Sequence, residues 1–178
     1  MIDIYFEEVF NPGIYSNAFL RKILSKYLHV NNNELNIVKT KYGKPYLKSY
    51  RHMHFNISHT REAIACAISD KQIGIDIERI KPFNKRIAEK FFTKNEQEYI
   101  FNKREDENVR FFEVWTRKEA YVKWLGKGMV IPFNSFDVLK DSKILTNYIG
   151  DYVLSVCSTN KTELNEIDNF SYYNCKII

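Results

Sequence analysis

Isoleucine occupies every second position of residues 73–78. This period of two predicts a β-strand with the isoleucines on one face and Gly74, Asp76 and Glu78 on the other. Two carboxylates that share a strand face repel each other unless a cation or a hydrogen-bond donor lies between them. Gly74 leaves room for a ligand or another backbone to approach closely. The alternative is a half-exposed strand whose acidic face is simply solvated.

Short apolar or alternating runs predict further strands. They cover residues 2–6, 35–39, 63–69, 135–139, 152–157 and 172–177, together with a short strand that runs from His54 into Ser58-His59-Thr60. Only three residues, 70–72, separate the strand at 63–69 from the strand at 73–78. A connection this short predicts an antiparallel hairpin between those two strands.

Helical spacing of apolar residues predicts the helices. They cover residues 17–28 with Ser16 as N-cap, residues 85–92, a helix that starts after Thr93, and residues 107–125. Thr93 and Glu96 match the capping box that begins a helix. Gly126 is a typical C-cap for the longest of the four. The mixture of strands and helices predicts a protein that contains both sheets and helices.

The composition is typical of a soluble globular protein. Hydrophobic residues make up 44% and charged residues 28% of the 178 positions, which is enough to bury a core in one domain or two small lobes. No run approaches the ~20 apolar residues of a membrane span. The N-terminus lacks the basic start and apolar centre of a signal peptide. We therefore expect a cytoplasmic protein.

The cysteine spacing and the net charge limit the redox state of the thiols and the class of binding partner. Cys66, Cys157 and Cys175 are far apart and form no Cys-x-x-Cys pair. Reduced, buried thiols are therefore expected rather than disulfides or a zinc site. The net charge of +5 suits an anionic partner such as a nucleotide, a nucleic acid or an acidic protein, without choosing among them.

Several polar residues stand where a turn or a strand end presents them to a ligand. Lys44 lies in the turn Tyr42-Gly43-Lys44-Pro45, and Ser58 and His59 lie where a strand stops. Loops and strand ends often carry binding groups. Taken alone, however, Lys44 is more often an exposed turn lysine, and His59 is more often a structural hydrogen-bonding residue. No Gly-x-Ser-x-Gly pattern surrounds Ser58, which argues against a serine nucleophile.

Three helical residues have both a structural and a chemical interpretation. The Glu96 carboxylate completes the capping box, or it serves as a base. Glu119 and Lys123 are spaced i, i+4 and share a helix face. They form either an ordinary surface ion pair, which stabilises a helix by only ~0.3 kcal/mol, or part of a site.

The order of five short motifs resembles the 4′-phosphopantetheinyl transferases. They are Gly-Lys-Pro at 43–45, Phe-Asn-Ile-Ser-His at 55–59, Ile-Gly-Ile-Asp-Ile-Glu at 73–78, Phe-Phe-Thr-Lys-Asn-Glu at 91–96 and Trp-Thr-Arg-Lys-Glu-Ala-Tyr-Val-Lys at 115–123. The resemblance is firm from about Tyr42 to Pro132 and looser on either side. It is greatest to the surfactin-synthetase-activating (Sfp-like) class, whose chains are longer than those of the holo-acyl-carrier-protein synthase class.

The resemblance implies a reaction and a cofactor. Such enzymes transfer the 4′-phosphopantetheine arm of coenzyme A to a serine of an apo acyl or peptidyl carrier protein and release adenosine 3′,5′-bisphosphate. They use Mg²⁺, with Mn²⁺ as an alternative. The positions that correspond to the family's metal ligands are Asp76, Glu78 and Glu119. Hard cations of this kind prefer carboxylate and phosphate oxygens.

The resemblance also implies roles for the remaining motif residues. Glu96 corresponds to the glutamate that accepts the proton of the carrier serine, and Lys123 to the lysine that contacts the pyrophosphate. Lys44, Ser58 and His59 correspond to residues that hold the phosphates of coenzyme A. By the same correspondence, Asp76 contacts coenzyme A through the metal ion. Glu119 and Lys123, together with Glu96, are the expected catalytic residues.

The fold implied by the resemblance is α+β, with two similar α/β lobes in a pseudo-twofold arrangement. The lobes are expected at residues 1–72 and 73–178, with coenzyme A in the cleft between them, and such chains are usually monomers. One departure concerns the N-terminal lobe, which lacks basic positions that clamp the 3′-phosphate in longer members. Arg21, Lys22 and Lys26 are the candidates to replace them.

Two rival functions follow from the same sequence. A single-stranded nucleic-acid binder would use the aromatic and basic residues for stacking and phosphate contacts. However, the basic residues are dispersed, and the acidic strand would repel phosphate in the absence of a metal. An inactive relative would keep the fold without the chemistry, which the retained carboxylates and Lys123 oppose. The carrier protein, and the choice between coenzyme A and its acyl derivatives, are left open by the sequence.

Overall fold

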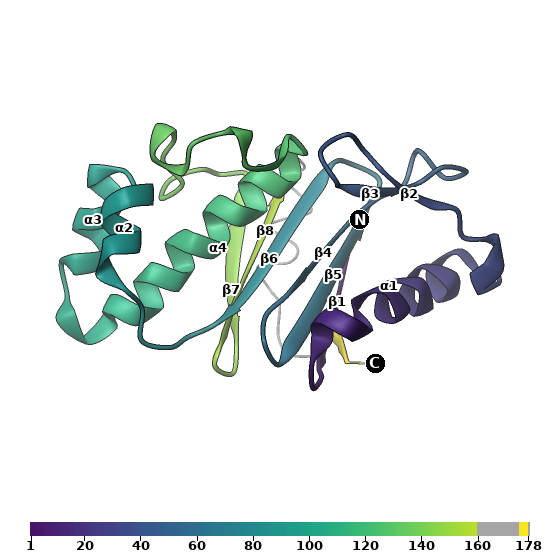
Figure 1. The fold of residues 1–178 in the computed structure, drawn as a ribbon, viewed down its shortest axis with the longest axis horizontal. Coiled ribbons are helices and arrows are strands. Elements are labelled where there is room, and N and C mark those ends of the chain that lie inside the picture. Colours follow the sequence, from purple (N-terminus) through teal and green to yellow (C-terminus); the bar gives the residue numbers. More distant parts are fainter. Residues whose placement is uncertain (160–174, 178) are drawn as a thin grey trace.

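Two β-sheets with an apolar cluster between them form the centre of the molecule, and a long helix covers the outer face of each (Figure 1). The computed structural model describes residues 1–159 and 175–177. The first sheet has the order β4 (His54–His59), β5 (Ala63–Ser69), β1 (Ile2–Glu8) and β9 (Cys175–Ile177). The second has the order β6 (Ile73–Arg79), β8 (Tyr152–Ser158) and β7 (Ile144–Ile149).

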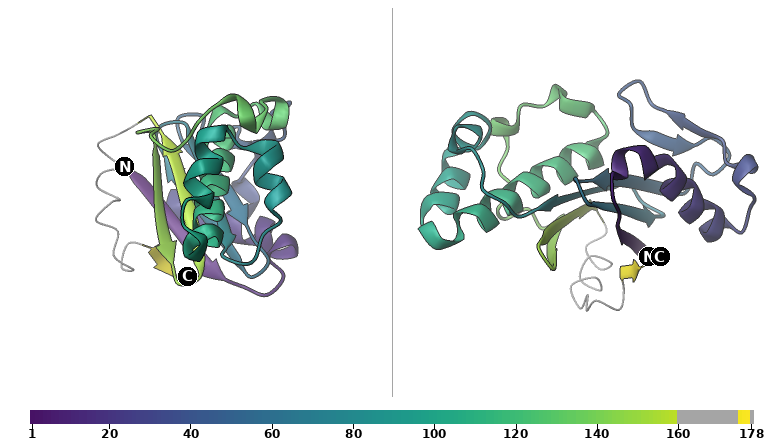
Figure 2. Two further views of the ribbon diagram at one scale, coloured as in Figure 1. Left: turned by 90° about the vertical axis from the view of Figure 1, so that its left-hand side faces the viewer. Right: turned by 60° about the horizontal axis from the view of Figure 1, so that its bottom comes forward.

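Helices and a small hairpin complete the fold. They are α1 (Pro12–Leu28), α2 (Lys85–Phe91), α3 (Lys94–Phe101) and α4 (Glu107–Leu125), with β2 (Ile37–Lys39) and β3 (Pro45–Leu47) as the hairpin and short 3₁₀ turns at Asn32–Glu34, Arg104–Asp106, Gly128–Val130 and Phe133–Ser135. The loop after α4 lies beside the turn before β3 in the views of Figures 1 and 2. Among the described residues, no helix combines the length and the apolar character that crossing a membrane requires.

Strand alternation explains the layers. In β5 the alanines at 63, 65 and 67 face the second sheet, while Ile64, Cys66 and Ile68 pack under α1. In β6 the isoleucines face the first sheet, as their period of two predicts, and the opposite face of the strand lies under α4. A separate aromatic-rich cluster fills the space between α4 and the second sheet. The expected α+β fold is confirmed, while the pseudo-twofold relation and the lobe boundary at residue 72 stay predictions.

The predicted hairpin between residues 63–69 and 73–78 is wrong. Strand β5 pairs with β1 and β4, and β6 pairs with β8 in the other sheet. The short connection at 70–72 therefore passes the chain from one sheet to the other instead of closing a turn within one sheet. Residues 175–177 return to the first sheet and lie parallel to β1, so this sheet is not built from the N-terminal half alone.

Two local predictions are also corrected, and a third is tested only in part. Helix α1 begins at Pro12 after Asn11, not after Ser16, whose hydroxyl donates to the Gly13 carbonyl within the helix. Proline suits the first turn because its missing N–H would have no partner there. Residues 135–139 form no strand. The expected strand at 172–177 is observed at 175–177, and residues 172–174 lie outside the described residues.

The remaining element predictions are confirmed closely. Helix α4 covers the predicted residues and ends at Gly126, which has a positive φ of 66°. The capping box before α3 has both of its hydrogen bonds. Two strands were not predicted, β3 and β7, and both are short or half-exposed.

Candidate active site

A row of polar side chains joins the two sheets where β4 runs beside β6. Asn56 accepts a hydrogen bond of 2.9 Å from the backbone N–H of Ile75. Two residues further along β4, the Ser58 hydroxyl donates to Asp76 over 2.7 Å, and after another two, the Thr60 hydroxyl donates to Glu78 over 3.1 Å. The period of two places Asn56 and Ser58 on one face of β4, and Thr60, directly after the strand, continues that face. We refer to Asn56, Ser58, Thr60 and their β6 partners as the polar row.

Asp76 is the centre of the row. It is only 4% exposed, and its Oδ1 accepts hydrogen bonds from Ser58 and from the Lys123 ammonium at 2.6 Å. Lys123 also donates to the Ser58 hydroxyl over 2.9 Å. The other carboxylate oxygen, Oδ2, is buried and has no hydrogen-bond partner in the described part of the chain. Such an oxygen normally requires a partner.

Two further carboxylates share the electrostatic environment of Asp76. Burial, then the charge of Asp76, raises the pKa of Glu78, although the bond from Thr60 opposes this. Burial, then Asp76, raises the pKa of Glu119 to about 7, with a further contribution from Glu78. Like charges in a poorly solvated place disfavour ionisation. This part of the cleft therefore carries more negative charge than Lys123 alone neutralises.

Lys123 does not form the ordinary helix-surface ion pair with Glu119. Its ammonium crosses from α4 to the polar row and binds Asp76. The alternative of a simple i, i+4 pair is therefore not observed. Glu119 instead lines a cavity of about 330 Å³ together with Lys44, Asn56 and Lys123.

Lys44 lies in the turn between β2 and β3 and links this hairpin to both α4 and β6. Its ammonium donates to the Ile73 carbonyl over 2.8 Å and to the Lys123 carbonyl over 2.7 Å. The second bond satisfies a carbonyl in the last turn of α4, which has no partner inside the helix. Gln72 does the same for the carbonyl of Trp124. Burial lowers the pKa of Lys44 to about 8.

Glu96 is held by structural contacts on both of its oxygens. One oxygen accepts from the Val138 N–H over 2.9 Å. The other accepts from the Thr93 N–H and lies 2.8 Å from the Lys118 ammonium. Glu96 and Lys118 are both fully buried. These contacts favour the structural interpretation of Glu96 that the capping box predicted.

Gly74 is needed for the packing of α4 against β6. A Cβ atom at this position would overlap the Ala120 carbonyl oxygen and the Trp124 backbone nitrogen. Of the two reasons expected for a glycine here, a ligand or another backbone, the structure therefore supports the backbone. The close approach of α4 is what brings Glu119 and Lys123 to the acidic strand.

The remaining predicted residues lie at or beyond the edge of this cluster. His59 ends β4 with an exposed side chain, and the nearest neighbour of a Cβ at Gly13 would be its ring at 4.0 Å. Arg21 binds Asn17 and the carbonyls of the Asn32 loop, so it holds the end of α1 and not the cleft. Cys66 and Cys157 are free and buried, as expected.

Sequence reasoning missed Asn56, Thr60 and Gln72 as members of this network. For the first two, the sequence did carry a signal. Asn56, Ser58 and Thr60 occupy every second position, so a strand places them on one face, and Ile57 and His59 lie on the other. Gln72 had no comparable signal, since its importance depends on where α4 ends.

The donor set suits a hard cation, which would balance the negative charge of these carboxylates. Asp76, Glu78 and Glu119 offer only oxygen atoms, and one oxygen of Asp76 is buried without a partner. These are the ligands that Mg²⁺ prefers. Even so, within residues 1–159, no three acidic, histidine or cysteine side chains are grouped closely enough to hold a metal ion. Lys123 occupies the accessible oxygen of Asp76.

Comparison with known proteins gives one family over both halves of the chain. A model described as "4′-phosphopantetheinyl transferase superfamily" matches residues 72–165, and one described as "4′-phosphopantetheinyl transferase, N-terminal" matches residues 4–72. The chain is 46% identical over 130 residues to the 4′-phosphopantetheinyl transferase Gsp of Aneurinibacillus migulanus, which covers 72% of this chain and 54% of the relative. It is 33% identical over 135 residues to Sfp of Bacillus subtilis, covering 75% and 60%. These matches span less than two thirds of each relative.

Proposed function

The chain belongs to the 4′-phosphopantetheinyl transferase superfamily, and we propose that it transfers the 4′-phosphopantetheine arm of coenzyme A to a serine of an apo carrier protein. Adenosine 3′,5′-bisphosphate is the second product. The observation that carries this proposal is the cluster of Ser58, Asp76 and Lys123, which brings three separate family motifs within hydrogen-bond distance at a cleft that Glu119 also lines.

Asp76, Glu78 and Glu119 are the residues that would hold Mg²⁺, or Mn²⁺ in its place. The raised pKa values of Glu78 and Glu119 and the unpartnered oxygen of Asp76 support a cation here. A bound divalent ion neutralises charge on the phosphoryl group and on its leaving oxygen. Lys123 stays close enough to the polar row to stabilise negative charge that develops on the pyrophosphate.

Coenzyme A would occupy the cleft between residues 1–72 and the rest of the chain. The cavity that reaches Glu119 and Lys123 supports a place for the pyrophosphate. A second cavity of about 390 Å³, lined by Phe91, Trp115 and Phe133, also reaches Glu119 and is mostly apolar. It suits the less polar parts of the transferred arm. His59, at the far end of β4, remains the candidate for the 3′-phosphate.

The contacts of three residues argue for supporting roles. Ser58 orients Asp76 and Lys123, and Lys44 fixes the end of α4, although either could also contact a phosphate of the substrate. Glu96 keeps its proposed role as a proton acceptor only if its buried pair with Lys118 opens during the reaction.

The test is direct transfer to a carrier protein. The chain is incubated with coenzyme A, Mg²⁺ and an apo acyl or peptidyl carrier, and the carrier is then weighed by mass spectrometry. A gain of one phosphopantetheine arm that disappears with a chelator supports the proposal. No gain with several carriers of different pathways would contradict it. Size-exclusion chromatography of the same sample tests the expected monomer.

Matched variants separate loss of chemistry from loss of fold. Asp76→Ala should abolish transfer and also remove the Mn²⁺-dependent broadening of the amide signals of β6, a readout that needs no activity. Glu89→Ala, an exposed carboxylate on α2, should leave both unchanged. Binding of a single-stranded oligonucleotide with no transfer activity would instead favour the rival nucleic-acid function.

A further inference from the structure

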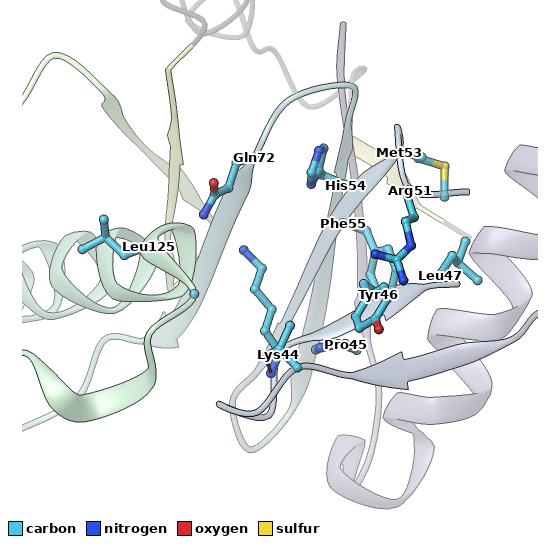
Figure 3. Close-up of a pocket in the computed structure, with 12 residues that line it drawn as sticks. Lys44, Pro45, Tyr46, Leu47, Arg51, Met53, His54, Phe55, Gln72 and Leu125 are labelled. Atoms are coloured by element: carbon cyan, nitrogen blue, oxygen red, sulfur yellow. Dashed lines mark hydrogen bonds between the residues drawn. The ribbon is translucent and has the colours of Figure 1, made fainter. Parts of the chain in front are cut away.

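A third cavity lies beyond Lys44, at the end of β4 that is opposite to His59. Figure 3 shows the residues that line it, which come from the β3 hairpin, the start of β4 and the C-terminal end of α4. Its volume of about 530 Å³ lies within the range of small-molecule sites. It shares Lys44, Pro45 and Gly126 with the smaller cavity that reaches Glu119. The Lys44 side chain, held by the carbonyls of Ile73 and Lys123, therefore lies between the two.

Two cationic or proton-donating side chains, Arg51 and His54, line this cavity. Arg51 lies over the ring of Tyr46, with its guanidinium carbon 5.4 Å from the ring centre (Figure 3). In the described part of the chain, the side chains of Arg51 and His54 make no hydrogen bond and no ion pair. An arginine that lies over an aromatic ring still has N–H groups with which to bind an anion.

The electrostatic environment of His54 indicates a positive field in the cavity. Burial, then the charge of Lys44, lowers the pKa of the His54 imidazole. Lys71 and His52 act in the same direction, and Asp70 opposes them. Among these groups, Lys44 and Lys71 carry positive charge near this end of β4, and Asp70 carries negative charge. A field of this sign raises the local concentration of anions.

Apart from Thr40, Lys44 and Gln72, the rest of the cavity wall is largely apolar. Leu47, Met53 and Phe55 belong to the core under α1 and are each at most 7% exposed, and Leu125 faces them from α4. An inorganic anion would leave this wall in contact with water. A ligand with one anionic end and an apolar or aromatic body would cover both kinds of surface.

We propose that this cavity binds an organic anion in which a carboxylate or a phosphate monoester is attached to an aromatic or heteroaromatic ring. Arg51 binds the anionic group through two parallel N–H donors, and His54 donates a third hydrogen bond. The ring packs between Tyr46 and the apolar wall. The proposal does not depend on the transfer activity, because none of these residues belongs to the polar row.

Nuclear magnetic resonance on the full ¹⁵N-labelled chain tests this site with three probes. They are benzoate, adenosine 5′-monophosphate and inorganic phosphate. At least one ring-bearing probe should shift the amide signals of Arg51, His54 and Gln72 in a saturable way, with inorganic phosphate roughly tenfold weaker. Benzoate alone would identify a carboxylate ligand, and the nucleotide alone a phosphate ester. Shifts confined to Ser58 and Asp76 would place the probe in the other cleft and overturn the proposal.

Variants at the anion-binding end sharpen the test. Arg51→Gln should weaken binding of the active probe by about tenfold or more, since hydrogen bonds between charged groups are the strong ones. Arg61→Gln removes an equal charge from an exposed position beyond His59 and should change nothing. An equal loss of affinity in both variants would show that only the net charge matters and would contradict the site. Unchanged affinity in Arg51→Gln would contradict it as well.

The pH dependence of benzoate binding gives an independent check on His54. Benzoate stays ionised at neutral pH, whereas His54 gains a proton as the pH falls through its lowered pKa. Binding should therefore tighten on acidification, and His54→Gln should remove this dependence while keeping most of the affinity. A pH dependence that persists in His54→Gln would exclude His54 from the site.

Discussion

The Lys118 ammonium lies 2.8 Å from the Glu96 carboxylate, and both side chains are fully buried between α3 and α4. Lys118 also donates to the carbonyls of Phe133 and Phe136. The pair therefore fixes the segment after α4 as well as the two helices. This relationship gives Glu96 a structural reason to be present, whether or not it also accepts a proton.

Glu96→Gln should lower the free energy of unfolding by about 3 kcal/mol, because removing one member of a buried ion pair leaves the other charge uncompensated. Urea denaturation at neutral pH measures this change. Glu98→Gln, an exposed carboxylate on the same helix, should alter stability by less than about 0.5 kcal/mol. Full stability of Glu96→Gln combined with slow transfer would favour the catalytic interpretation.

Gly74→Ala should destabilise the fold by about 3 kcal/mol, because the added methyl group meets backbone atoms of α4 that have little freedom to move. The same denaturation experiment applies. Gly13→Ala is the matched control, since its Cβ would have no neighbour closer than 4.0 Å and alanine favours a helix by up to about 1 kcal/mol. Similar behaviour of the two variants would show that α4 does not press on β6 in solution.

Lys44→Met should cost about 2 kcal/mol of stability, because two carbonyl groups lose their shared donor in a half-buried place. Lys48→Met, an exposed position in the same hairpin region, should be nearly neutral. If Lys44 acts only as this tie, the affinity for coenzyme A keeps its salt dependence in the variant. A weaker salt dependence would instead indicate a lost phosphate contact.

Stability should depend on the ionisation of Glu119. Its pKa is raised from 4.5 to about 7 in the folded state, so the folded chain binds more protons than the unfolded chain in this interval. The free energy of unfolding therefore falls as the pH rises from about 4.5 to 7. Glu119→Gln should lack this fall and be more stable than the parent by roughly 2 kcal/mol at pH 8, after allowance for its partial exposure.

Denaturation at pH 4 and pH 8 checks this prediction. The two proteins should unfold alike at pH 4, where the carboxyl group is largely protonated in both states. Mg²⁺ should raise the stability of the parent at pH 8 more than that of Glu119→Gln if the ion binds here. Parallel pH profiles for the two proteins would contradict the raised pKa.

The motif residues were predictable because each depends on local sequence. The alternation of residues 73–78 predicted which face Asp76 and Glu78 share, and Thr93 with Glu96 predicted the start of α3. Gly126 likewise predicted the end of α4. In each case the information lies within a few neighbouring residues, where propensity and capping operate.

The errors arose where distant contacts decide the outcome. The connection at 70–72 looks like a hairpin turn, but β6 finds a better partner in β8, about eighty residues later. Residues 135–139 alternate like a strand, yet side chains bind their backbone: Glu96 and Arg117 hold Val138, and Lys118 holds Phe136. No local pattern predicts that a helix will supply those partners.

The polar row also links the chemistry of the cleft to the joint between the two sheets. Strands β4 and β6 run side by side, but they are joined through the side chains of Asn56, Ser58 and Thr60 instead of a continuous backbone ladder. Two of these hydrogen bonds, each worth about 1 kcal/mol, end on Asp76 and Glu78, the carboxylates that face the cleft. A ligand that takes over their oxygens therefore competes with Ser58 and Thr60, and in doing so it changes how strongly this edge of the two sheets is joined.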